Sequence, residues 1–132
     1  GCASGYSAAV LAELAAELVA VESAAALAAA ARTNLAALGL DNATVIEGPL
    51  EAGAPGHGLF DVILLEGMAP EPPRRLFDQL AENGRLVVLQ KQGSATVAHL
   101  YVRSGGDVAG RPEFNTTLPP LPATKTPPAF VF

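Results

Sequence analysis

The feature that most constrains the fold of this sequence is the glycine-punctuated turn at residues 1–5, which runs directly into a helical pattern. Glycine allows backbone conformations and close approaches that other residues do not, so such a turn brings N–H groups and a helix start near a ligand. Glu22 ends the next apolar strand, 17 residues after Gly5. In dinucleotide-binding folds a carboxylate about 20 residues past the turn meets the ribose hydroxyls. The spacing therefore predicts a nucleotide-binding site built from the turn and Glu22.

Apolar periodicity predicts helices alternating with strands along the chain. We expect Val10 and Leu14 to belong to the buried stripe of the first helix, and Ser23 to cap the second helix. We expect helices over 6–17, 24–38 and 74–82, strands over 18–22, 43–46, 60–65 and 85–89, and an antiparallel hairpin that begins near 96 and turns at 104–107.

This order of elements predicts an α/β fold, which is a Rossmann-like, mostly parallel sheet with helices on both faces and an antiparallel C-terminal hairpin. Ligands in such sheets bind at the carboxyl ends of the strands. Three predicted strands end in an acidic residue, Glu22, Glu47 or Glu66, and the last two are each followed by glycine. We therefore expect a nucleotide-shaped ligand at these strand ends.

Composition argues against several classes of partner. The net charge of −5 disfavours nucleic acids and anionic membranes, which bind basic surfaces. The apolar runs are much shorter than the roughly 20 residues that span a bilayer. The single cysteine, Cys2, excludes an internal disulfide, and His57 and His99 have no neighbours at metal-ligand spacing. We expect a cytoplasmic protein with no metal, in which Cys2 packs in the core and the two histidines are structural or face solvent.

Five segments resemble the motifs of the class I S-adenosylmethionine-dependent methyltransferases, and within them the protein-L-isoaspartate O-methyltransferases. Residues 1–8 (GCASGYSA) resemble the first motif of that family, G-T-G-S-G-Y-Q-A or close to it. Residues 19–22 resemble the acidic end of its second strand, and residues 39–48 resemble its third strand with the D-G that follows. The fourth and fifth strand motifs are matched by residues 60–63 and 73–89.

The resemblance, over about residues 1–103, implies transfer of a methyl group from S-adenosylmethionine to an isoaspartyl carboxyl group of a protein or peptide, a protein-repair reaction. It implies that Glu22 binds the ribose, that Glu47 and Gly48 border the adenine, and that the turn approaches the amino-acid part of the cofactor. It assigns no catalytic residue. The residues implied in cofactor binding are Gly1, Ala3, Ser4, Gly5, Tyr6, Glu22, Ser23, Glu47, Gly48 and Glu66.

The sequence departs from the family pattern in three places. Ala3 stands where the family has the middle glycine of its first motif, and residues 65–69 replace a V-T-A-A segment. The chain begins at Gly1, without an initiator methionine or a strand before the turn. We therefore expect residues 1–132 to be the C-terminal portion of an S-adenosylmethionine-binding domain, truncated before its first central strand and inactive alone. The proline-rich tail, residues 119–132, is expected to lack regular structure until the last three residues.

Two other functions remain open at this point. One is a non-catalytic module, a degenerate nucleotide-binding or scaffold domain, which Ala3 and the missing upstream region favour slightly. The other is a NAD-dependent oxidoreductase, which Glu22 fits but which the absence of G-x-G-x-x-G disfavours. Glu66 is as consistent with a surface carboxylate as with a site residue. The sequence reveals neither the acceptor with certainty nor the oligomeric state.

Overall fold

The computed structural model describes residues 1–122 and divides the chain into two compact units, Gly1–Gly58 and a second that begins at Leu59. Each unit has its own sheet. Residues 130–132, the point up to which regular structure is not expected in the tail, lie outside the described residues. None of the helices in the described part of the chain combines the length and apolar character needed to cross a membrane.

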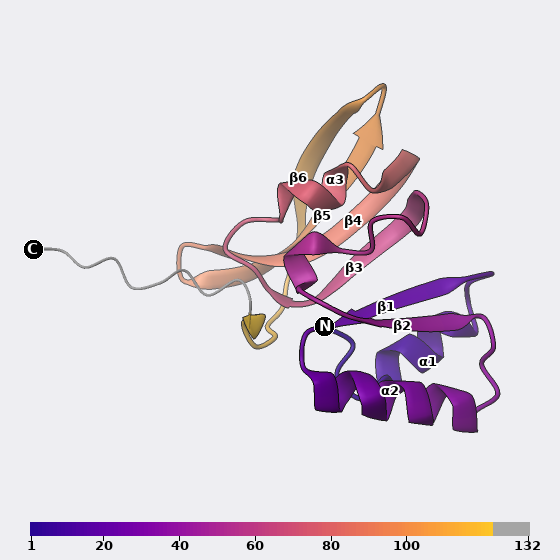
Figure 1. Ribbon diagram of the computed structural model, residues 1–132. Coiled ribbons are helices and arrows are strands. Elements are labelled where there is room, and N and C mark those ends of the chain that lie inside the picture. Colours follow the sequence, from indigo (N-terminus) through magenta and orange to yellow (C-terminus); the bar gives the residue numbers. More distant parts are fainter. Residues whose placement is uncertain (123–132) are drawn as a thin grey trace, which may run out of the picture. The chain divides into compact units, whose positions relative to one another are not determined.

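The first unit is a two-stranded parallel sheet with two helices on one face. Strands β1 and β2 pair in parallel from Leu18↔Ala43 to Glu22↔Glu47. Both helices lie on the same side of this pair (Figure 1). The elements are α1 (Tyr6–Ala12), β1 (Leu18–Glu22), α2 (Ala25–Ala37), β2 (Ala43–Glu47) and a short 3-10 turn (Leu50–Ala52).

Small side chains make the inward face of α1, and this contradicts the predicted stripe of that helix. Ala8 and Ala12 are the buried residues of the helix, whereas Val10 is half exposed and Leu14 is 81% exposed. The helix also ends five residues before the expected position 17. The side-chain amide of Asn42 donates hydrogen bonds to the carbonyls of Ala12 and Ala15, at 2.8 and 3.0 Å, which stabilises the chain in a non-helical path there.

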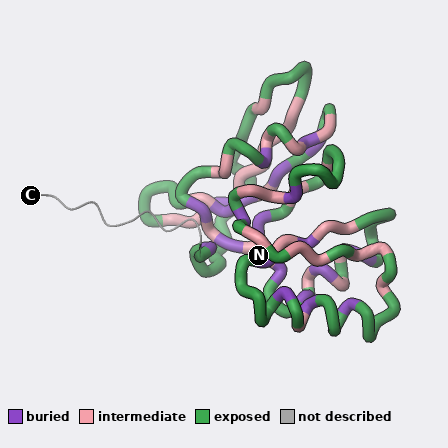
Figure 2. Tube along the Cα trace, viewed as in Figure 1, coloured by how far each residue is buried: buried purple, intermediate pink, exposed green. Residues whose placement is uncertain are grey.

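Helix α2 has buried positions interspersed with exposed ones along its length (Figure 2). Its buried residues are Ala28, Ala31 and Leu35. Gly39 follows the helix with φ 69° and donates to the carbonyl of Ala36, while Leu40 donates to Leu35. This is the glycine-terminated helix end that the sequence predicts. Cys2 packs with Ala31 and Leu35 in the same core, as expected.

The second unit is a four-stranded sheet in the order β3-β4-β5-β6. Strands β3 and β4 are parallel, and the remaining pairs are antiparallel. The α/β class and the antiparallel C-terminal hairpin are therefore confirmed, whereas helices on both faces and a central strand before Gly1 stay predictions. The elements are β3 (Phe60–Met68), α3 (Arg74–Phe77), β4 (Leu80–Gln92), β5 (Ala95–Ser104) and β6 (Asp107–Asn115).

Helix α3 is four residues long, so the predicted helix over 74–82 is wrong in its second half. Leu80 is completely buried and pairs with Phe60 as the first residue of β4. The guanidinium of Arg103 donates to the carbonyls of Phe77 and Leu80, both at 3.2 Å. A distant strand therefore satisfies carbonyls at the helix end, and the chain leaves the helix early.

Candidate ligand-binding site

The centre of the candidate site is Glu22, the last residue of β1. It is 5% exposed and is the one buried polar or charged residue in the described part of the chain. Its Oε2 accepts a hydrogen bond from the backbone N–H of Ala3 at 2.9 Å. Its Oε1 accepts one from the N–H of Ala24 at 3.0 Å. The structure therefore brings this carboxylate against the glycine turn.

Ser23 does not cap α2, so that prediction is wrong. The helix begins at Ala25, and its N-cap position is Ala24, which makes no side-chain cap. The hydroxyl of Ser23 instead donates to Oε1 of Glu22 over a long 3.5 Å. Glu22 therefore accepts hydrogen bonds from both of the residues that follow it, Ser23 and Ala24.

The turn itself is held by α2. Gly5 has φ 91° and donates its N–H to the carbonyl of Cys2 at 2.9 Å. A methyl group on Gly5 would lie 3.2 Å from Ala31. The side-chain amide of Asn34 donates to the carbonyl of Ser4 at 2.9 Å. The sequence predicts Ala31 on the buried stripe of this helix, which is confirmed, but it does not indicate that Ala31 and Asn34, three residues apart on one helix face, hold the turn.

The N–H groups at three predicted positions of the turn have partners within the protein. Gly1 donates to Val21, Ala3 to Glu22, and Gly5 to Cys2. The turn therefore supports the Glu22 carboxylate directly, rather than presenting these three N–H groups to a ligand.

Ala3 and Ser4 are the exposed residues of the turn, and Tyr6, the first residue of α1, is exposed beside them. Tyr6 is 84% exposed, so it does not pack under the turn. Ala3 has φ 47°, a left-handed conformation that costs a residue with a side chain on the order of 1 kcal/mol. A glycine, which the family motif has at this position, would avoid that cost.

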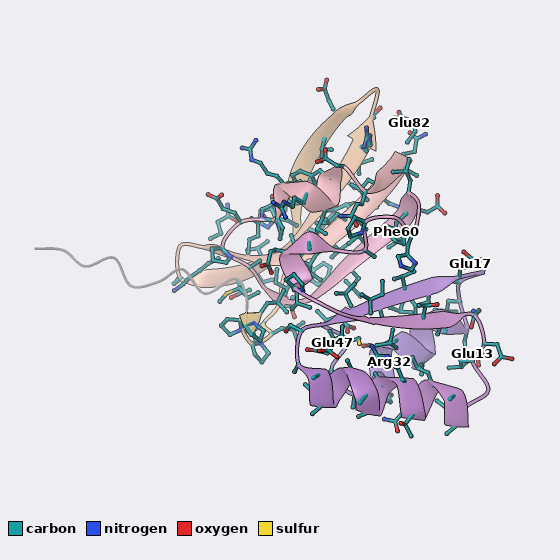
Figure 3. The ribbon with its side chains drawn as sticks, viewed as in Figure 1. Glu13, Glu17, Arg32, Glu47, Phe60 and Glu82 are labelled. Atoms are coloured by element: carbon teal, nitrogen blue, oxygen red, sulfur yellow. The ribbon has the colours of Figure 1, made fainter. Side chains whose placement is uncertain are left out.

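The two remaining first-unit candidates lie at the end of β2. Gly48 donates its N–H to the carbonyl of Glu22 at 3.0 Å, which ties the two strand ends together. Glu47 is exposed and pairs with Glu22 in the strand register. In Figure 3, Glu13 and Glu17 lie at the opposite end of the first unit from Glu47. The parallel strands thus collect Glu22, Glu47 and Gly48 at their carboxyl end.

Glu66 belongs to the second unit and stays a prediction as a site residue. The expected strand end at this position is wrong, because β3 continues to Met68. Glu66 is partly buried within the strand. His57 is exposed and lies in the loop before β3.

The environment of Glu22 favours its charged form. Burial by itself raises the pKa of the carboxyl group, but the hydrogen bonds from Ala24, Ala3 and Ser23 lower it. The pKa of Glu22 is therefore lowered from its ordinary value of 4.5. A buried carboxylate held ionised by backbone donors is suited to accept hydrogen bonds from hydroxyl groups.

We expect the stability of the fold to depend on pH through Glu22. Since folding lowers this pKa, the stabilisation is fully present above the unfolded value and is lost as the pH falls through the folded value. Between about pH 5 and about pH 3 the free energy of unfolding should fall more steeply for the wild type than for Glu22→Gln. Urea unfolding at several pH values checks this, and parallel curves for the two proteins would contradict it.

A shallow hollow of about 260 Å³ lies elsewhere in the first unit, between α2 and β2. Its lining includes Arg32, Leu35, Asp41 and Val45. The side chain of Arg32 donates to the carbonyl of Val45 at 3.2 Å, on this edge of the sheet. None of the lining residues belongs to the turn or to the carboxyl end of β1, so the hollow is separate from the candidate site.

Residues 1–125 match the family model of protein-L-isoaspartate(D-aspartate) O-methyltransferase. The chain is 51% identical to the protein-L-isoaspartate O-methyltransferase of Methanoregula boonei over 88 residues, which are 67% of this chain and 41% of that protein. It is 44% identical to the enzyme of the same name from Koribacter versatilis over 102 residues, 77% of this chain and 45% of that protein. The chain thus matches less than half of the length of each of these relatives.

Two solved structures have a similar fold. A protein-L-isoaspartate O-methyltransferase matches with a TM-score of 0.85 and 27% identity, over 92% of this chain and 40% of that one. A putative protein-L-isoaspartate O-methyltransferase from Plasmodium falciparum, in complex with S-adenosyl-L-homocysteine, matches with a TM-score of 0.70. The second match has 23% identity over 81% of this chain and 53% of that one, and it shows likeness of fold alone.

Proposed function

This chain belongs to the protein-L-isoaspartate(D-aspartate) O-methyltransferase family, and from this premise we propose that the protein carrying it methylates isoaspartyl residues. The methyl group of S-adenosylmethionine would pass to the free α-carboxylate of isoaspartate in a protein or peptide. The observation that supports this most directly is the buried Glu22 carboxylate, which faces the glycine turn and is held there by the N–H of Ala3.

The donor set around Glu22 fits the ribose of this cofactor. Each carboxylate oxygen has two lone-pair directions. The N–H of Ala3 occupies one on Oε2, and the N–H of Ala24 occupies one on Oε1. The two ribose hydroxyls would take the remaining directions and replace the long contact from Ser23. Gly48 and Glu47, at the neighbouring strand end, are proposed to border the adenine.

The reaction requires the protein mainly to place the methyl donor and the acceptor carboxylate next to each other. When bound, the cofactor supplies a methyl group already activated by its sulfonium. Glu22 and the turn would orient the adenosyl group, and the exposed Ser4 and Tyr6 would lie beside the amino-acid part. Because the acceptor is an anionic carboxylate, no strong general base is required. Holding the acceptor and donor in line accounts for most of the expected rate.

The proposal is tested on the intact protein that contains this sequence. We expect calorimetry to show binding of S-adenosylhomocysteine but not of NADH. With labelled cofactor, an isoaspartyl peptide should be methylated, and the same peptide with ordinary aspartate should not. Binding of NADH alone would favour an oxidoreductase, and binding of neither would favour a non-catalytic module. Either outcome would overturn the proposal.

We propose the cytoplasm as the compartment and isoaspartyl proteins or peptides as the partners. The single cysteine is consistent with this compartment, and the family match supports these partners.

A further inference from the structure

A short segment after β6 docks on the carboxyl end of β3. Residues 119–121, called the strap here, follow the hairpin and are drawn with a short arrow near the end of the described chain in Figure 1. The N–H of Met68 donates to the carbonyl of Pro119 at 3.0 Å. The N–H of Leu121 donates to the carbonyl of Met68, also at 3.0 Å. These two bonds make a parallel bridge between Met68 and Pro120.

The strap lies on the side of β3 opposite to β4. The register between β3 and β4 shifts between Leu64 and Met68, so this end of the strand is irregular. Beyond the shift, the N–H of Ala69 donates to the carbonyl of Leu89 in β4 at 2.9 Å. Met68 therefore faces the strap with both backbone groups, while the next residue is bound to β4. The carboxyl end of β3 is held from both sides.

The side chain of Leu121 packs against Gly67, where any larger residue would overlap with it. It is 5% exposed, although every other residue from 111 to 122 is exposed. A methyl group built on Gly67 would lie 2.6 Å from Cδ2 and 2.7 Å from Cγ of Leu121. Such distances are too short for carbon atoms, so Gly67 and Leu121 are matched in shape.

The connection to the strap is short. Strands β3 and β6 are opposite edges of the sheet, and only residues 116–118 lie between β6 and the strap. The N–H of Thr116 is bound to the carbonyl of Thr96 at 3.0 Å, which fixes the start of this crossing. Proline at 119 and 120 restricts the backbone further and lowers the entropy lost on docking.

We propose that Leu121 is a positioning residue for methyl transfer, which fixes the carboxyl end of β3 through its contact with Gly67. In an open α/β sheet this end of a strand carries residues that meet the ligand. The consequence for catalysis rests on the proposed function. The Glu22 contacts proposed for the cofactor lie wholly within the first unit, so the strap is assigned to placement of the isoaspartyl acceptor.

Hydrogen exchange tests the contact itself. In Leu121→Ala the amides of residues 68 and 121 should exchange about tenfold faster, because both donate across the strap. The amide of Ala69, bound to β4, should be unchanged. Leu118→Ala is the matched control, since Leu118 lies in the connection just before the strap and is 46% exposed. Equal effects of the two variants, or equal acceleration at residue 69, would overturn the docking proposal.

Kinetics of the intact protein test the consequence. Leu121→Ala and Gly67→Ala should each raise KM for an isoaspartyl peptide about tenfold, because a displaced strand end loses acceptor binding. Affinity for S-adenosylhomocysteine should stay within about twofold of the wild-type value, because the contacts proposed for it at Glu22 and the turn are left intact. The double variant Gly67→Ala/Leu121→Ala should have a lower KM than Gly67→Ala alone. Truncating Leu121 removes its Cδ2 and Cγ, the two atoms closest to the new methyl group on residue 67.

The outcomes separate this proposal from the proposed function. A similar loss of cofactor affinity, an unchanged KM, or no recovery in the double variant would each overturn the positioning role. If the wild type does not methylate the peptide, the proposed function and the catalytic role of Leu121 both fail, and exchange still decides whether the strap docks as described.

Discussion

Replacing Glu22 with glutamine is expected to weaken binding of S-adenosylhomocysteine about 100-fold, which corresponds to about 2.7 kcal/mol. Hydrogen bonds to a charged acceptor are each worth about 1.5–3 kcal/mol, and the proposed site gives the ribose two of them. The amide also turns an N–H₂ group towards the N–H of Ala3 or of Ala24, which both point at the carboxylate. Calorimetry on the intact protein measures the affinity.

Two further variants control this experiment. Glu17→Gln removes an exposed acid that lies at the other end of the first unit from Glu47, and it should leave affinity unchanged. Glu22→Asp keeps the charge but shortens the side chain, so its affinity should fall between those of the wild type and the glutamine variant. Thermal unfolding shows whether each variant is folded. If a folded Glu22→Gln protein binds S-adenosylhomocysteine with an affinity within about threefold of wild type, Glu22 does not bind the cofactor.

The two strands of the first unit and the position of Glu22 were predictable from local sequence. A short apolar run closed by an acid gives β1 its observed bounds, Leu18–Glu22. Helix α2 is predicted by its alanine-rich composition, and its C-terminal end is predicted by Gly39. These features depend on neighbours in the chain, so they can be seen in the sequence alone.

The features that sequence reasoning missed depend on distant residues. The inward face of α1 is made by Ala8 and Ala12, which pack against residues distant in the sequence, and alanine carries little periodic signal. The length of α3 depends on Arg103, 26 residues after Phe77.

The prolines of residues 119–132 predict that this segment does not pair, but the strap does pair with β3. Proline lacks only the N–H donor, and the carbonyl of Pro119 and the N–H of Leu121 supply the two bonds. In the site, Glu22 was predicted from its spacing to the turn. The contacts of Asn34 and Ala31 with the turn could not be predicted, because neither residue type indicates a role in a binding site by itself.

Replacing Gly5 with alanine is expected to destabilise the fold by about 2–4 kcal/mol. Part of the cost, about 1–2 kcal/mol, comes from placing a side chain at φ 91°. The rest comes from the new methyl group, which would lie 3.2 Å from both the Cα and the Cβ of Ala31. Because Ala31 is completely buried in α2, the helix cannot move aside without opening the core.

Gly39→Ala is the matched control for this variant. Gly39 has a similar conformation, φ 69°, but nothing lies within 4 Å of an added methyl group. Its replacement should therefore cost only the conformational part, about 1–2 kcal/mol, in urea unfolding. The difference between the two variants measures the packing of the turn on α2. Equal losses would mean that this packing does not fix the turn, and the N–H of Ala3 would then have no rigid support from which to hold the Glu22 carboxylate.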